Sequence, residues 1–296
     1  MKKNIFNGIM FGISASLWWG LIGVFYFKSV SFVGTIELVI HRTIWTAFLL
    51  TITTTLYSKW NNIIFILKNI KKTFLLLITG ILIFINWSTW IYAVVTNKLI
   101  DASFGYYIMP ILSLFFGILF LGESYNKQKI LSVTLVVVSV IYLLLNFNSV
   151  PWTGLIVAFT WSTYSLLRKK INVQVDLGLL LESLFMTPIA LLAFYLISYD
   201  GNNFFSIHDP VISFWLFLAG VMTVIPLFLF LKGVELAGLG TSGMIFFITP
   251  TCQFLLGILY YNEYFDINKL IGFIIIWIAV IIYLKDLTNE KEIKLV

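Results

Sequence analysis

The sequence predicts an all-α polytopic membrane protein with ten transmembrane helices arranged as a 5+5 inverted repeat. Three observations predict this class. Sixty per cent of the residues are hydrophobic and only 11% are charged, whereas a soluble domain carries about 25% charge. Apolar runs of about twenty residues, long enough to cross a bilayer as helices, recur along the chain. One of these runs is repeated in register in the second half of the chain.

The ten expected spans are joined by short connections, which leave no room for a soluble domain. The first run is too long for the core of a signal peptide and lacks a small-residue cleavage site, so we expect it to be retained. The spans are expected at residues 5–27, 36–57, 73–96, 101–121, 129–146, 152–168, 178–198, 211–231, 241–260 and 269–285.

The orientation follows from the basic residues outside the spans. Fifteen lysines and arginines fall on the side of the N-terminus and three on the other side. Because basic residues concentrate on the cytoplasmic side of membrane proteins, both termini are expected to be cytoplasmic. The segment 59–72, with basic ends and an apolar middle, is expected to be a short helix lying on the cytoplasmic interface.

The repeat lies in the fourth and ninth spans. The stretch Ser103–Glu123 aligns without a gap with Gly243–Glu263, and a proline, a glycine and a glutamate recur in register at Pro110 and Pro250, Gly117 and Gly257, Glu123 and Glu263. Since the chain has only six prolines, this match indicates two homologous halves. With five helices in each half the second half starts on the opposite face, which makes the repeats inverted.

The expected organisation is therefore a first five-helix repeat at residues 1–147, a second at 148–287 and a polar, frayed tail at 288–296. Pro110 and Pro250 are expected to act as helix hinges, because proline removes a helical hydrogen bond. Glu123 and Glu263 each end a span, and each is expected to cap the helix that follows it.

The second span carries the most informative charges of the chain, Glu37, His41 and Arg42. A charge at membrane depth is costly and by default indicates a paired or water-facing functional group. One interpretation is a structural ion pair near the outer interface. The other places Arg42 against an anionic group of a solute, with Glu37 or His41 as a partner or proton carrier. Glu182 in the seventh span is the counterpart in kind of Glu37, so coupling or gating is a hypothesis for all three ionisable groups.

Polar and aromatic side chains at mid-membrane depth predict a solute cavity. Helix–helix hydrogen bonding is the more conservative interpretation of Asn86, and core filling is an equal alternative for Trp19. The residues expected to line the cavity are Trp19, Arg42, Asn86, Tyr92, Tyr106, Trp161 and Tyr164.

Several function classes are disfavoured. Cys252 is the only cysteine, and no HExxH, GxSxG or glycine-rich phosphate loop occurs, so we expect no metal, no cofactor and no enzyme. The net charge of +6 lies in inter-helix loops and does not indicate nucleic-acid binding. The expected partners are a small-molecule solute and the lipid bilayer, and the sequence carries no prediction of the oligomeric state.

Taken together, these residues resemble the RarD group of EamA-type permeases in the drug/metabolite transporter superfamily. The resemblance covers about residues 5–285. It rests on Glu37 with Arg42, Asn86-Trp87 before Tyr92-Ala93-Val94, the run Ser103–Pro110, Gly117–Glu123, Tyr164 with Arg168-Lys169, Glu182 with Pro188, Thr223 with Pro226-Leu227, and Pro250-Thr251.

The resemblance implies a ten-helix inverted-repeat fold that moves small metabolites across the bacterial inner membrane. The expected function is a permease for a zwitterionic, aromatic or amine-containing metabolite, working by alternating access. A drug or toxic-solute exporter of the same fold is the alternative, and a membrane-embedded enzyme or sensor is the alternative from another class. Met109 stands where the family leads us to expect an asparagine, and Phe246 where we expect a glutamine. Both departures predict a different substrate.

Overall fold

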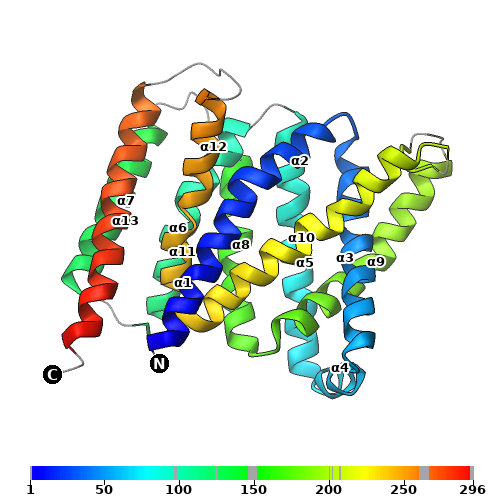
Figure 1. The fold of residues 1–296 in the computed structure, drawn as a ribbon, viewed down its shortest axis with the longest axis horizontal. Coiled ribbons are helices and arrows are strands. Elements are labelled where there is room, and N and C mark those ends of the chain that lie inside the picture. The colour runs from blue at the N-terminus through cyan, green and yellow to red at the C-terminus, as the bar shows by residue number, and fades with distance from the viewer. Residues whose placement is uncertain are drawn as a thin grey trace.

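A computed structural model describes residues 2–96, 99–123, 126–145, 152–199, 201, 203–206, 208–259 and 267–293. Within these residues the regular structure is helical throughout (Figure 1). The helices are α1 (Lys2–Leu17), the π-helical turn η1 (Trp18–Ile22), α2 (Gly23–Ser29), α3 (Thr35–Leu56), α4 (Trp60–Leu67), α5 (Ile70–Val95), α6 (Leu99–Leu121), α7 (Lys127–Leu144), α8 (Trp152–Ile171), α9 (Val175–Tyr199), α10 (Pro210–Ala237), α11 (Leu239–Ile245), α12 (Ile248–Leu259) and α13 (Ile267–Ile293).

Each of the ten expected spans coincides with one helix or with a short succession of helices. Within the described residues, five segments are long and apolar enough to cross a membrane: Asn4–Ser29, Thr35–Leu56, Ile70–Ala93, Val175–Tyr199 and Pro210–Ala237. Shorter apolar helices occur at Ile108–Leu121, Leu239–Cys252 and Leu270–Tyr283. Large apolar side chains such as Phe48, Leu192 and Phe214 face outward, as expected of a surface in contact with lipid and not with water.

The helices pack in a small number of main pairings. Helix α1 packs on α10, α3 on α9 and α10, α5 on α8 and α9, α6 on α8 and α11, and α7 on α13. Figure 1 shows α7 and α13 together at one edge of the bundle and α3 with α9 towards the other. The largest buried apolar cluster includes residues of α3, α5, α6, α8, α9 and α10, and its members Trp87, Met109, Trp161 and Phe246 line the candidate site.

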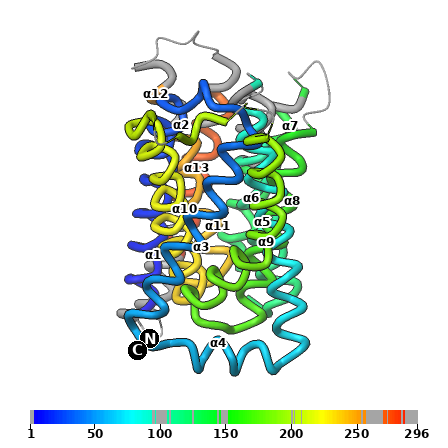
Figure 2. The backbone as a smooth tube through the Cα atoms, turned by 90° about the vertical axis from the view of Figure 1, so that its right-hand side faces the viewer, coloured from blue at the N-terminus to red at the C-terminus, as the bar shows by residue number. Residues whose placement is uncertain are grey.

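Both ends of the chain lie at the same end of the bundle, and α4 runs across that end (Figure 2). The short helix expected within 59–72 is therefore present at Trp60–Leu67. The C-terminal segment differs from the expected frayed tail, because α13 continues as a helix to Ile293. The sequence DLTNEKEI at its end contains mostly residues that a helix tolerates well and no proline or glycine.

The small-residue face of the first span serves close packing. A Cβ atom on Gly8 would lie 2.7 Å from the backbone nitrogen of Ala237 in α10, and one on Gly20 would lie 2.7 Å from Cys252 Cβ in α12. Helices from the two ends of the sequence can therefore touch through their backbones only because these positions lack side chains. This contact places η1, with its Trp19, against the second half of the chain.

The two proline-bearing spans of the repeat differ in shape. Helix α6 continues through Pro110, whereas the ninth span is interrupted by a turn at Phe246 and Phe247, between α11 and α12. Pro250 has no N–H for the carbonyl of Phe246, which instead accepts a hydrogen bond from the Thr249 amide at 3.0 Å. The hinge role predicted for Pro110 and Pro250 stays a prediction, with the interruption found only beside Pro250.

Glu123 caps a helix other than the expected one. Its carboxylate accepts hydrogen bonds from the backbone N–H groups of Leu239, at 2.6 Å, and Gly240, at 3.0 Å, at the start of α11. Gly122 takes a left-handed conformation with φ +64°, and the amide of Glu123 then donates to the carbonyl of Gly117 at 3.0 Å, which ends α6. The cap thus joins the two halves of the chain. Glu263 lies outside the described residues.

Candidate functional site

Five of the seven residues predicted for the cavity meet around one small space between the helices. Its volume is about 40 Å³, enough for a few water molecules. Its walls come from η1, α2, α3, α5, α6, α8 and the turn after α11, and thus from both halves of the chain. We call this space the central cavity. The predicted residues that line it are Trp19, Arg42, Asn86, Tyr106 and Trp161.

Arg42 supplies the charge in the wall of the central cavity. Only 5% of the residue is exposed. Its Cζ atom lies 4.4 Å from the ring centroid of Trp87 and 5.6 Å from that of Phe27. Within the described part of the chain the guanidinium makes no hydrogen bond or ion pair, and Nε is buried without a partner. Aromatic faces stabilise such a cation, but a buried charge normally also has an anion beside it.

Aromatic rings from distant parts of the chain form the rest of the wall. The ring centroids of Trp19 and Trp161 are 5.2 Å apart in an edge-to-face arrangement, and Phe246 lies 5.6 Å from each of them. Tyr106 stacks on Phe246 at 5.9 Å. Offset and edge-to-face pairs are the favoured aromatic geometries, so these rings hold one another in place. The central cavity therefore combines one cation with an extended apolar surface.

Asn86 lines the central cavity, but its side-chain amide donates hydrogen bonds to a neighbouring helix. Its amide nitrogen donates to the backbone carbonyl of Val157 at 2.9 Å and to the Thr160 hydroxyl at 3.0 Å, both in α8. These bonds fix α5 against α8. The conservative interpretation of Asn86 therefore describes its contacts, and any additional contact with a solute would have to use its carbonyl oxygen.

The structure does not bring Tyr92 or Tyr164 to the central cavity. Tyr92 is 41% exposed, because six residues along α5 turn it about 120° away from Asn86. Tyr164 lies nearly one turn beyond Trp161 on α8 and is fully buried. Its hydroxyl donates to Glu182 Oε2 at 3.2 Å. Tyr164 thus belongs to a second polar group.

That second group centres on the carboxylate of Glu182, which we call the Glu182 cluster. Thr79 donates to Oε1 at 2.6 Å, and Arg168 Nε lies 3.3 Å from the same oxygen. The members come from α5, α8 and α9, and all are buried. Gly80, next to Thr79, allows the approach, because a Cβ there would lie 3.1 Å from the Glu182 carbonyl oxygen. The cluster consists of Thr79, Tyr164, Arg168 and Glu182.

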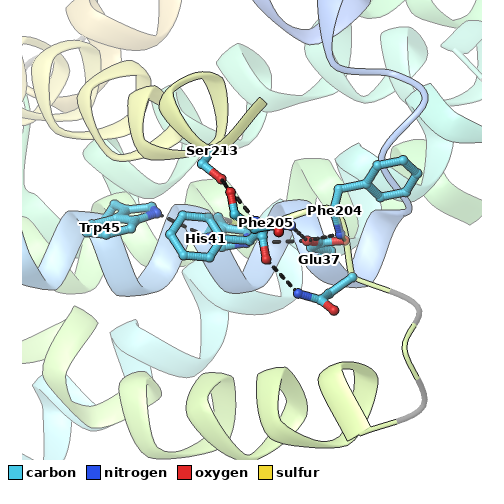
Figure 3. A network of polar contacts seen from close by, with 8 residues as sticks. Glu37, His41, Trp45, Phe204, Phe205 and Ser213 are labelled. Atoms are coloured by element: carbon cyan, nitrogen blue, oxygen red, sulfur yellow. Dashed lines mark hydrogen bonds and ion pairs between the residues drawn. The ribbon is translucent and has the colours of Figure 1, made fainter. Parts of the chain in front are cut away.

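Glu37 and His41 form a third polar group, at the start of α3 (Figure 3). Glu37 accepts hydrogen bonds from the backbone N–H groups of Phe204, at 2.8 and 3.0 Å, and of Phe205, at 2.9 Å. His41 Nδ1 accepts from Trp45 Nε1 at 3.1 Å, and its Nε2 lies 3.5 Å from Glu37 Oε1. The group ties α3 to the connection before α10. Glu37 and Arg42 are not paired with each other.

Sequence reasoning missed part of the cavity wall. Trp87, Trp90 and Phe27 line the central cavity but resemble ordinary apolar residues of a membrane helix in the sequence. The neighbouring Asn86 was the available signal for the two tryptophans. Met109 and Phe246, the two departures from the expected pattern, both line the cavity. The residues at which this chain departs thus lie where a bound solute would be touched.

The comparisons with known proteins concern the family and the fold. The EamA-like transporter family matches the chain twice, at residues 6–145 and 149–285. The chain therefore belongs to the EamA-like transporter family, whose members are multi-pass membrane proteins.

Within this family the chain is of the RarD type. It is 33% identical over 284 residues to "Protein RarD" of Salmonella typhi, covering 96% of each chain. It is 36% identical over 285 residues to an "Uncharacterized transporter" of Vibrio cholerae serotype O1, covering 96% of this chain and 94% of that protein.

A solved crystal structure supports the fold. The alignment covers 94% of this chain and 97% of the chain in that structure, with a TM-score of 0.64, although only 14% of the residues are identical. At this identity the likeness concerns the fold alone.

Proposed function

We propose that the chain is a secondary transporter for a small solute that carries an anionic group beside an aromatic or apolar part, such as a zwitterionic or aromatic metabolite. It moves this solute across the bacterial inner membrane by alternating access, with the site between two five-helix repeats. One observation carries the proposal: Arg42 is a buried guanidinium with no anionic partner among the residues that the structure describes, in the wall of a cavity built from both halves of the chain.

The charge of Arg42 is the reason for proposing that the solute carries an anionic group. Removing a charge from water is costly, and the attraction of a nearby anion is what normally offsets this cost. The Trp87 and Phe27 rings beside Arg42 offset only part of it. A carboxylate on the solute would form an ion pair with Arg42 and accept hydrogen bonds from its N–H groups. The rings around Trp161 and Phe246 would contact the rest of the solute.

The pattern of helix contacts supports the inverted repeat. If the first to fifth spans are exchanged with the sixth to tenth, the packing of α1 on α10 becomes that of α8 on α5, and α3 on α10 becomes α9 on α5. The pairs α3 with α9, α6 with α11 and α7 with α13 map onto themselves. The double family match has the same halves, so repeats at 1–147 and 148–287, ten spans in total, form part of the proposal.

The size of the central cavity fits a closed step of alternating access. Sites for small organic molecules usually enclose about 300–1,000 Å³, whereas the central cavity measures about 40 Å³. A solute therefore enters only if helices of the two repeats separate. The distribution of basic residues supports a cytoplasmic location for the end of the bundle that carries α4 and both termini, and this orientation is part of the proposal.

Transport by purified protein in liposomes tests the proposal. The protein would be screened for thermal stabilisation by amino acids, nucleosides, amines and aromatic carboxylates, since a bound solute raises the melting temperature by mass action. The solutes that stabilise it would then be followed as radiolabelled compounds into and out of the liposomes. We expect concentrative or exchange transport of an anionic solute, reduced at least tenfold in Arg42→Ala and less in Asn86→Ala.

The matched control is Phe48→Ala, a lipid-facing change on the same helix as Arg42. It should insert and transport like the unmodified protein. The proposal fails if correctly inserted Arg42→Ala protein moves every transported solute at the unmodified rate, or if no solute crosses the membrane with the unmodified protein.

A further inference from the structure

A second, larger cavity opens at the end of the bundle that carries α4. It has a volume of about 560 Å³, and its walls come from the turn between α8 and α9 and from the end of α10. We call it the vestibule. Four cationic residues line it, Lys59, Arg168, Lys169 and Lys232, against two acidic ones, Asp176 and Glu235. The vestibule is thus large enough for a metabolite and carries an excess of positive charge.

Most of these charges already have partners. Lys59 pairs with Asp176, and Lys232 pairs with Glu235 at 2.8 Å. Lys169 donates to the backbone carbonyls of Val234, at 2.7 Å, and Glu235, at 2.8 Å, at the end of α10. The remaining cation is Arg168, whose bonds are incomplete.

Arg168 is only 6% exposed, yet two of its three nitrogens lack a hydrogen-bond partner. Nη2 donates to the carbonyl of Val175 at 3.2 Å, whereas Nη1 and Nε are buried without one. Nε lies 3.3 Å from Glu182 Oε1, longer than the 2.7–2.9 Å typical of a charge-assisted hydrogen bond. Gly178 makes room for this group, since a Cβ there would overlap the guanidinium.

Arg168 also stands between the two cavities. Trp161, Tyr164 and Arg168 follow one face of α8. The backbone of Arg168 is therefore about 10 Å along the helix from that of Trp161, whose ring lines the central cavity. A third, very small cavity of about 10 Å³ is lined by both Trp87 and Glu182. The Glu182 cluster therefore lies between the vestibule, which Arg168 lines, and the central cavity, which Trp87 lines.

We propose that the vestibule is a second anion-binding site, in which a carboxylate of the solute binds Arg168 in place of Glu182. Glu182 can release Arg168, because the hydroxyls of Thr79 and Tyr164 continue to donate to its oxygens. The exchange weakens the link between α8 and α9 and prepares the route to Arg42. This inference rests on the proposed function and adds to it the residue that receives the solute on the cytoplasmic side.

The test measures anion binding in the vestibule directly. Gln174 is exposed and lines the vestibule, so Gln174→Cys in a Cys252→Ser background places one reactive thiol there. Its alkylation by uncharged N-ethylmaleimide would be timed in maltoside micelles at increasing concentrations of benzoate. Benzamide, the uncharged analogue, is the matched control. We expect benzoate to slow alkylation in a saturable manner and benzamide to have no effect.

The Glu182 substitutions distinguish exchange from simple attraction. Glu182→Gln removes the competing carboxylate, so benzoate should protect at a concentration about tenfold lower or less. Arg168→Gln with Glu182→Gln should abolish protection. Gly178→Ala, which displaces the guanidinium without changing any charge, should weaken protection and replaces Glu182→Gln if that variant does not fold. Unchanged protection in the double variant overturns the inference. So does the absence of a gain in Glu182→Gln or, where Gly178→Ala takes its place, the absence of a weakening.

Two further arms separate the possible sources of the anion and the two proposals. Protection by phosphatidylglycerol but not by benzoate would overturn the inference in favour of a lipid headgroup. In Arg42→Ala protein, vestibule protection should persist although transport is lost. Persisting protection together with unchanged transport would overturn the proposed function alone, and lost transport without any vestibule protection in the unmodified protein would overturn this inference alone.

Discussion

Arg42 and Arg168 are equally buried, at 5% and 6% exposure, but their surroundings differ. Arg168 lies beside the Glu182 carboxylate, whereas Arg42 lies against the Trp87 and Phe27 rings with no anion beside it in the described chain. A buried arginine with a carboxylate of the same chain holds helices together. A buried arginine without such a carboxylate lowers the stability of the protein, and binding of an anionic ligand can offset this loss. The comparison therefore separates an arginine that a solute can reach only in competition with Glu182 from one that has no competing carboxylate in the described chain.

The largest effect is expected from breaking the paired arginine. Arg168→Ala leaves the Glu182 carboxylate buried without its cation, which should lower the free energy of unfolding by about 3–5 kcal/mol. Denaturant unfolding in detergent, followed by tryptophan fluorescence, measures this loss. The matched control is Lys232→Ala, which breaks the exposed pair with Glu235 and should cost less than about 1 kcal/mol. Equal losses in the two variants would contradict the structural role of Arg168.

The unpaired arginine should behave in the opposite way. Arg42→Met replaces a buried charge by an apolar chain of similar length, so the free energy of unfolding should change by less than about 1 kcal/mol or increase. Affinity for the transported solute should fall about ten- to hundredfold, the equivalent of a hydrogen-bonded charge at about 1.5–3 kcal/mol. Arg42→Lys, which keeps the charge but not the fork of donors, should be intermediate. A strongly destabilised Arg42→Met protein would remove the contrast.

Glu37 is a third buried charge, and it differs from both arginines because its carboxylate accepts hydrogen bonds from backbone amides. Glu37→Gln should cost about 1–2 kcal/mol, because charge-assisted hydrogen bonds to Phe204 and Phe205 become neutral ones or are lost. Hydrogen exchange of these two amides should become faster, with solute affinity unchanged. A stable Glu37→Gln protein that binds solute but no longer accumulates it would instead support a coupling role for Glu37.

The positions of the helices could be predicted from the sequence, because an apolar run of sufficient length allows few other structures in a membrane. The directions of individual side chains could not. Tyr92 was expected at the cavity for its polar aromatic character, but its angle on α5 relative to Asn86 turns it outward. Tyr164 was expected there too, but Glu182 on another helix holds its hydroxyl.

Contacts between distant segments also limited the prediction. The aligned prolines of the fourth and ninth spans suggest two equivalent helices, yet of these two only the ninth is interrupted. There the Ser16 hydroxyl lies 3.5 Å from the carbonyl of Ile245, and Thr249 donates to the carbonyl of Ser16 at 3.1 Å. Such partners, more than 200 residues apart in sequence, supply bonds that the interrupted helix lacks. Glu123 is a similar case, since its cap joins it to α11.

The π-helical turn at Trp18–Ile22 has a consequence for how solute preference can evolve. A π-helical turn holds one residue more than an α-helical turn, and each residue of an α-helix corresponds to about 100° of rotation. Trp19, before the end of the turn, and Phe27, after it, both face the central cavity. If the turn became α-helical without loss of a residue, Phe27 would rotate by about 100° relative to Trp19 and away from Arg42. Substitutions elsewhere in the turn that favour α-helical winding can thus alter the lining without changing any residue of it.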